Sequence, residues 1–142
     1  MPKKTPAVPK RVLIIEDDED VAKILEVLVR GLHAEVLLAD DGMTGVQMAR
    51  TQQPDLVLVD MHLPGMNGLE VIRALRDTTQ LAGLPIIVIT GNSTVEYVRE
   101  TARLGADDFL VKANVLAGDG LERIEKFLST PGRAAPKKKK KP

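Results

Sequence analysis

The stretch that says most about this chain is LVLVDMHLPGMNG, residues 56–68. It opens with four apolar residues, typical of a parallel-sheet strand covered on both faces, and continues into a turn rich in Pro, Gly and Asn. Asp60 lies at the junction, where a buried carboxylate is costly unless it is paired. Ligands collect at the carboxyl ends of strands in open α/β sheets. Asp60 is therefore predicted to be a functional residue.

A second acidic cluster occupies the equivalent place earlier in the chain. The apolar run Val12–Ile15 is followed at once by Glu16, Asp17 and Asp18. Two strands that both end in carboxylates predict one shared anionic site. Acids from Asp18 onward also suit the first turn of a helix, where negative charge is favourable. We therefore assign Glu16 and Asp17 to the site and treat Asp18 as flanking it.

Strand-like and helix-like patterns alternate along the chain. Five apolar runs have strand length: Val12–Ile15, Val36–Ala39, Leu56–Val59, Ile86–Thr90 and Phe109–Val111. Each is followed by helical spacing, so the predicted fold class is α/β, a doubly wound sheet of five parallel strands. In the order 2-1-3-4-5 the switch point lies between strands one and three. That order brings Asp60 and the first acidic cluster together.

The helices are predicted from apolar spacing and capping residues. The first has six apolar residues on one inward face: Val21, Ile24, Leu25, Leu28, Val29 and Leu32. The second spans about 42–52, and the third begins at the N-cap Asn67. A capping box of Ser93 and Glu96 opens the fourth, which ends near Gly105. The last buries four apolar residues: Leu121, Ile124, Phe127 and Leu128.

Composition limits the classes of function. The chain has 142 residues, enough for one domain, of which 44% are hydrophobic but only three are aromatic. So few rings disfavour a platform that stacks nucleic-acid bases. The absence of Cys excludes disulfides and thiolate chemistry. Without a secretory signal or an apolar run near the roughly 20 residues that cross a bilayer, we expect a soluble, cytoplasmic protein with no membrane span.

The net charge of zero conceals an uneven distribution. Ten of the 20 basic residues lie in residues 1–11 and 129–142, which contain none of the 20 acids. Both ends are rich in Pro, Lys and Ala, so residues 1–10 and 129–142 are predicted to be disordered basic tails around a domain at 11–128. The lysine run 137–141 is expected to be solvated, with nonspecific contact to anions as the alternative and no specific nucleic-acid binding.

The predicted edge of the sheet carries the groups needed for phosphoryl transfer. Carboxylates at short range repel each other, and a divalent cation among them relieves that repulsion. Oxygen ligands favour Mg²⁺, with Mn²⁺ as the alternative. The fourth strand ends in the hydroxyl of Thr90, and the fifth ends beside the ammonium of Lys112. These groups predict phosphoryl transfer to Asp60 as nucleophile, assisted by Thr90 and Lys112.

Four ordered motifs make the chain resemble the response-regulator receiver domains of two-component signalling, the CheY-like family with a flavodoxin-like fold. They are VLIIEDDE (12–19), PDLVLVDMHLPGMNG (54–68), PIIVITG (85–91) and GADDFLVK (105–112), and the resemblance covers about residues 12–128. It implies that Asp60 accepts a phosphoryl group from a sensor histidine kinase or a histidine phosphotransfer protein.

The same resemblance implies roles for the residues around Asp60. The groups that would hold Mg²⁺ are Glu16, Asp17, Asp60 and the backbone carbonyl of His62. Thr90 and Lys112 would contact the phosphoryl oxygens, and Thr90 and Phe109 would form the switch. The chain departs from the family at Ala113. In the family, the residue after the lysine is usually a proline joined to it by a cis peptide bond. Phe109 also replaces the frequent tyrosine.

The chain is thus predicted to be a single-domain response regulator, a phosphoacceptor switch and not an enzyme beyond self-catalysed phosphorylation and dephosphorylation. Phosphorylation would alter the face of the fourth helix, fifth strand and fifth helix, where Tyr97, Val98 and Thr101 lie, and would signal to a downstream protein or by onward phosphotransfer. We expect a monomer or a weak homodimer. His62 and Asn92 occupy positions that tune the phosphoryl lifetime in the family.

Three alternatives remain at this level. The first is a pseudo-receiver that acts as an adaptor without phosphorylation. The second is a haloacid-dehalogenase-like phosphatase, whose second Asp, two residues after the nucleophile, is here His62. The third is a flavodoxin-like FMN carrier, which the acidic first loop and the scarcity of aromatic rings disfavour.

Overall fold

The structure is a computed structural model, and it describes residues 8–91, 95–115 and 119–129. Its centre is a five-stranded parallel sheet of order β2-β1-β3-β4-β5, which confirms the predicted fold class. The strands are β1 (Arg11–Ile15), β2 (Glu35–Ala39), β3 (Leu56–Asp60), β4 (Ile86–Thr90) and β5 (Asp108–Val111). Each observed strand lies within one residue of its predicted bounds.

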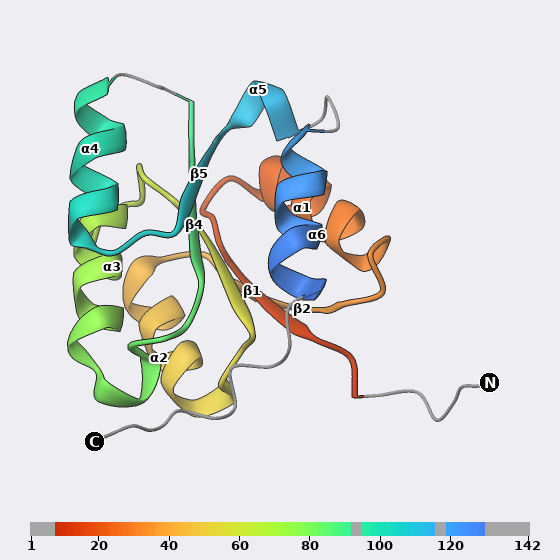
Figure 1. Ribbon diagram of the computed structural model, residues 1–142, viewed down its shortest axis with the longest axis horizontal. Coiled ribbons are helices and arrows are strands. Elements are labelled where there is room, and N and C mark those ends of the chain that lie inside the picture. Colours follow the sequence, from red (N-terminus) through yellow and green to blue (C-terminus); the bar gives the residue numbers. More distant parts are fainter. Residues whose placement is uncertain (1–7, 92–94, 116–118, 130–142) are drawn as a thin grey trace.

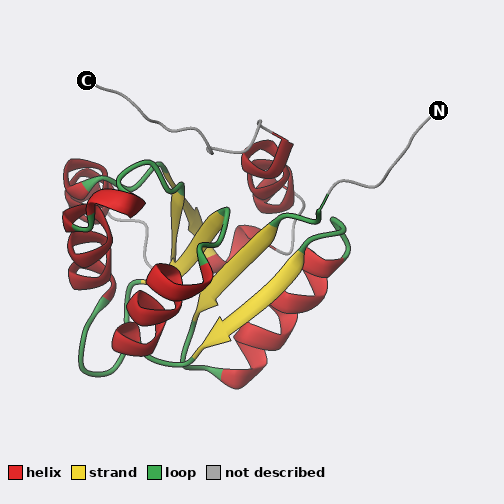
Figure 2. Cartoon of the chain, turned by 90° about the horizontal axis from the view of Figure 1, so that it is seen from below, coloured by secondary structure: helices red, strands yellow, loops and turns green. Residues whose placement is uncertain are grey.

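Helices cover both faces of the sheet (Figure 1 and Figure 2). They are α1 (Glu19–Arg30), α2 (Gly42–Gln52), α3 (Gly68–Asp77), the 3₁₀ turn η1 (Thr79–Leu81), α4 (Val95–Leu104), α5 (Lys112–Val115) and α6 (Asp119–Ser129). Helices α1 and α6 pack on one face, and α2, α3 and α4 pack on the other. No helix among the described residues has both the length and the apolarity of a membrane-spanning segment.

The central strand β3 supplies both cores. Because side chains alternate across a strand, Val57 and Val59 join the core under α2 and α3, whereas Leu56 and Leu58 join the core under α1 and α6. All four side chains are fully buried. The register places Ile15 beside Val59, so that β1 and β3 end at the same level of the sheet.

Local capping signals explain most helix boundaries. Asn67 is the N-cap of α3, and its side chain accepts from the Glu70 N–H at 3.0 Å while the Glu70 carboxylate accepts from the Asn67 N–H at 3.0 Å. Helix α2 has the predicted bounds. Helix α4 ends before Gly105, which has a φ of +112°. Ser93 of the expected capping box lies outside the described residues.

Two expectations about helices were wrong. Ile24 is 40% exposed, because the sheet covers only the row of α1 that carries Leu25 and Val29. Leu32 is half-buried but lies beyond the end of α1 at Arg30. The short elements η1 and α5 were not predicted, because three or four residues are too few to show helical periodicity.

The half-buried side chain of Arg76 ties the end of α3 to three other segments. It donates hydrogen bonds to the backbone carbonyls of Leu81 (3.2 Å), Ala82 (3.0 Å), Leu84 (2.7 Å) and Gly105 (2.7 Å). It also pairs with the Asp107 carboxylate at 2.9 Å, and the same carboxylate oxygen accepts from the Ile86 N–H at 2.8 Å. One guanidinium therefore joins η1, β4 and the turn before β5.

Candidate functional site

The carboxylate of Asp60 is the last side chain of β3 and is 3% exposed. Its Oδ1 accepts a hydrogen bond from the backbone N–H of His62 at 3.2 Å. The adjacent backbone is fixed to the sheet, because the Met61 N–H donates to the Ile89 carbonyl at 3.1 Å. The strand and the turn together therefore hold Asp60 at the carboxyl edge, where the sequence placed it.

Glu16 and Asp17 follow β1 at the same edge. The Glu16 N–H continues the ladder by donating to the Ala39 carbonyl at 3.0 Å, and the Glu16 side chain is buried. Asp17 is exposed. Asp18 is the N-cap of α1, and its side chain accepts from the backbone N–H of Asp20 at 2.9 Å. Asp18 therefore has a structural role at the start of α1.

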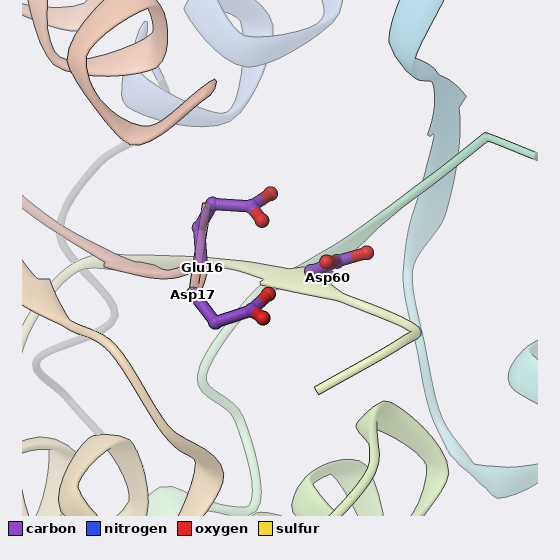
Figure 3. Close-up of side chains that lie close together, drawn as sticks. All are labelled: Glu16, Asp17 and Asp60. Carbon is purple, nitrogen blue, oxygen red and sulfur yellow. The ribbon is translucent and has the colours of Figure 1, made fainter. Parts of the chain in front are cut away.

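The three predicted carboxylates converge (Figure 3). Glu16, Asp17 and Asp60 each present an oxygen atom, and these atoms all lie within 4.8 Å of one another. Lys112, the first residue after β5, places its Nζ 3.5 Å from Glu16 Oε1 and 3.5 Å from Asp60 Oδ2. The ammonium pairs with two of the three carboxylates, so the ionised cluster keeps an excess of negative charge.

The pKa of Glu16 is raised to about 7, because burial and the nearby charge of Asp60 together outweigh the lowering effects of the Asp18 N–H and of Lys112. Glu16 Oε1 is buried and has no hydrogen-bond partner within the described part of the chain. A divalent cation would supply that partner and the missing positive charge. These residues therefore fit an oxygen-liganded ion such as Mg²⁺.

The predicted switch residues lie on the neighbouring strands. Thr90 is buried at the end of β4, where it pairs in register with Val111 of β5. Phe109 is half-buried and packs against the core on the α4 side, as Tyr97 also does. The peptide bond between Lys112 and Ala113, both described residues, is trans.

An aromatic contact beside the site had no signal in the sequence. The exposed ring of His62 meets Tyr97 of α4 edge-to-face, with 5.9 Å between ring centroids. The two residues also line a hollow of about 440 Å³ that reaches Asp17. The two residues are 35 positions apart and follow no local pattern, so only the fold reveals the contact.

Gly68 allows the turn after Asp60 to pack closely against β3. A Cβ atom at this position would lie 2.7 Å from the Asp60 carbonyl oxygen and 2.7 Å from Met61 Cα. We expect Gly68→Ala to lower the free energy of unfolding in urea by about 2–3 kcal/mol, because backbone atoms of the site must move. Gly83→Ala is the matched control, since a Cβ there meets nothing within 4 Å. Equal losses in both variants would contradict this account.

Comparisons with known proteins support this geometry. Residues 12–122 match the family described as "Response regulator receiver domain". Over 103 residues the chain is 36% identical to the DNA-binding response regulator MtrA of Mycobacterium tuberculosis H37Rv, an alignment covering 72% of this chain and 44% of that protein. Over 121 residues it is 39% identical to the transcriptional regulatory protein CusR of Escherichia coli K12, covering 83% and 51%.

Two solved structures show the same fold. The receiver domain of sensor histidine kinase PA1611 from Pseudomonas aeruginosa PAO1, with a magnesium ion coordinated in its active site cleft, superposes with a TM-score of 0.74 at 26% identity, covering 87% of this chain and all of that one. The BeF₃-activated N-terminal receiver domain of Klebsiella pneumoniae RstA gives 0.72 at 26%, covering 85% and 100%. The chain spans about half the length of the curated relatives, so the expectation of a single-domain regulator stays a prediction.

Proposed function

Because the chain belongs to the response regulator receiver domain family, we propose that it is a cytoplasmic phosphorylation switch that accepts a phosphoryl group on Asp60. The observation that carries the proposal is the convergence of Glu16, Asp17, Asp60 and Lys112 at one edge of the sheet. The proposed donor is the phosphohistidine of a sensor histidine kinase or a histidine phosphotransfer protein.

Mg²⁺ would be held by the carboxylates of Glu16, Asp17 and Asp60 together with the backbone carbonyl of His62, and Mn²⁺ is the alternative ion. When bound, the ion neutralises charge on the transferring group and on the carboxylates. Glu16 and Asp17 serve as ligands, while Lys112 holds Asp60 in place through its 3.5 Å ion pair.

In the proposed transfer, an Asp60 carboxylate oxygen forms a bond to phosphorus as the nitrogen–phosphorus bond of the donor breaks. The electron pair of the broken bond stays on the imidazole nitrogen, so no oxidant or reductant is needed. Lys112 and the hydroxyl of Thr90 then contact the phosphoryl oxygens. The added charge draws Thr90 inward and changes the space available to Phe109, which alters the face made by α4, β5 and α6.

Acetyl phosphate with Mg²⁺ tests the proposal without knowledge of the natural donor. We expect intact-mass spectrometry to show the addition of one phosphoryl group per chain, with an acyl phosphate that hydroxylamine removes. The reaction should be stoichiometric, because the transferred phosphoryl group stays covalently bound to Asp60. Sustained hydrolysis of phosphoesters would instead support the phosphatase alternative, and no mass change at all would contradict the proposal.

The raised pKa of Glu16, about 7, predicts that Mg²⁺ binding depends on pH. Binding requires the ionised carboxylate, which is mostly protonated at pH 6 and mostly ionised at pH 8 in the metal-free protein. Isothermal titration calorimetry should therefore give an affinity about tenfold weaker at pH 6 than at pH 8. Glu16→Gln should bind more weakly and lose most of this pH dependence. Equal wild-type affinities at the two pH values would contradict the assignment of Glu16.

A further inference from the structure

The outer face of α1 is apolar and exposed. Leu25 and Val29 point into the core, but Ile24 is 40% exposed and Val27 is 59% exposed. With Leu28 they line a hollow of about 490 Å³ on the helix surface. Exposed apolar side chains three residues apart on one helix face mark a contact surface more often than isolated ones do.

A strongly acidic groove adjoins this apolar face. It lies between α1 and the edge strand β2, has a volume of about 430 Å³, and includes Leu38, which is 45% exposed. Its acidic lining residues are Glu16, Asp17, Glu19, Glu26 and Asp40. Lys23 is its basic lining residue, with its Nζ 4.0 Å from Glu26. A segment suited to this surface would combine several positive charges with small apolar side chains.

The chain itself contains such a segment. Residues 130–142, TPGRAAPKKKKKP, carry six basic residues and no acid, together with two alanines and three prolines. The described chain reaches Ser129 at the end of α6, and α6 packs beside α1 on the same face of the sheet (Figure 1). The segment therefore begins next to the helix whose outer face is open.

The chain length between Ser129 and the lysine run is sufficient to reach the acidic groove. Eight peptide units separate Ser129 from Lys137, which extend to at most about 26–29 Å. The 12 residues of α1 rise about 18 Å along the helix axis. A segment that starts near the carboxyl end of α1 can thus place its lysines beside Glu19 and Asp40 at the other end.

We propose that residues 130–142 bind the outer face of α1 in the same chain, with Ala134 and Ala135 against Ile24 and Val27 and the lysine run over the acidic groove. The contact is intramolecular, so its effective concentration reaches the millimolar range even though each ion pair is weak. This inference goes beyond the proposed phosphorylation and does not depend on it. It predicts that any partner of α1 must displace the segment first.

A spin label on the lysine run tests the proposal directly. The chain has no Cys, so Lys139→Cys provides one labelling position in the full chain. We expect the nitroxide to remove most of the amide NMR signal intensity of α1 and β2 while sparing α3 on the opposite face. The effect should disappear at about 1 M salt, where the Debye length falls to about 3 Å. Equal signal loss on α1 and α3 would overturn the proposal.

Matched variants separate a specific contact from general charge attraction. Ile24→Ser combined with Val27→Ser should abolish the broadening of the α1 amide signals by the spin label. Met43→Ser, which alters a 61% exposed side chain of α2, should leave that broadening unchanged. If both variants behave alike, the proposed face is wrong. Mixing isotope-labelled chains with unlabelled spin-labelled chains completes the test: broadening that arises only between molecules would overturn the intramolecular contact.

The acidic groove has its own matched pair. Glu19→Gln with Asp40→Asn should reduce the broadening several-fold, because the lysines lose their nearest opposite charges. Glu122→Gln with Glu125→Gln removes the same charge from exposed positions of α6 and should have little effect. Equal reductions by the two pairs would show that only net charge matters, which contradicts binding in the groove.

Discussion

Asp60→Asn is expected to abolish phosphorylation by acetyl phosphate and Mg²⁺. The amide oxygen is a much weaker nucleophile than the carboxylate, and the side chain no longer carries the charge that pairs with Lys112 at 3.5 Å. Intact-mass spectrometry should show full loss of the phosphoryl adduct. Because Asn has nearly the same shape as Asp and accepts the His62 N–H in the same way, the fold should be retained.

The control for Asp60→Asn is Asp77→Asn, which alters an exposed aspartate at the end of α3. This variant should be phosphorylated as fully as the wild-type chain. The amide NMR spectrum or the urea transition of Asp60→Asn should show a folded protein. A phosphoryl adduct that persists in folded Asp60→Asn would place the acceptor elsewhere and refute the proposed function.

Arg76→Met is expected to lower the stability of the protein more than the loss of any other single polar side chain outside the carboxylate site. Methionine preserves much of the aliphatic length but removes the donors to four carbonyl groups, and it leaves the Asp107 carboxylate without its guanidinium. Hydrogen bonds made by a charged group contribute about 1.5–3 kcal/mol each, so losing several of them at once is expected to cost about 3 kcal/mol or more. Against a total of about 5–15 kcal/mol, urea denaturation should show a large shift of the midpoint.

Arg73→Met tests the same change on the exposed side of the same helix. Its free energy of unfolding should change by less than about 0.5 kcal/mol. Arg76→Lys adds a second comparison, because one ammonium cannot reproduce the spread of donors of a guanidinium. It should be destabilised nearly as much as Arg76→Met. If Arg76→Met and Arg73→Met proved equally stable, the role assigned to Arg76 would be wrong.

The fold could be predicted because the apolar runs that mark the strands end at the acidic residues that mark the site. The apolar runs that became β1, β3 and β4 are buried on both faces and contain no competing polar residue before their ends. Alternation with helices then leaves few topologies, and the switch point follows from the strand order. Asp60 and Glu16 were found for the same reason: each is the first acidic residue after such a run.

What the sequence did not reveal depends on packing between distant segments. Ile24 belongs to the apolar row of α1, yet among the described residues no other element covers it, and the pattern of one helix does not show which of its sides faces the sheet. Arg76 resembles an ordinary surface arginine until the turn after α3 folds over it. The exposure of Asp17 beside the buried Glu16 likewise depends on how α1 leaves the sheet.

The residues of the site lie far apart in the sequence, and this separation has a consequence for the protein during its synthesis. Glu16 and Asp17 emerge from the ribosome early and Asp60 follows, but Lys112 comes almost 100 residues after Glu16. Until that lysine arrives, the carboxylates lack their positive partner, and β5 does not yet close the sheet edge beside β4. Under the proposed function, a nascent chain would therefore lack a complete site for its phosphodonor until the domain is finished.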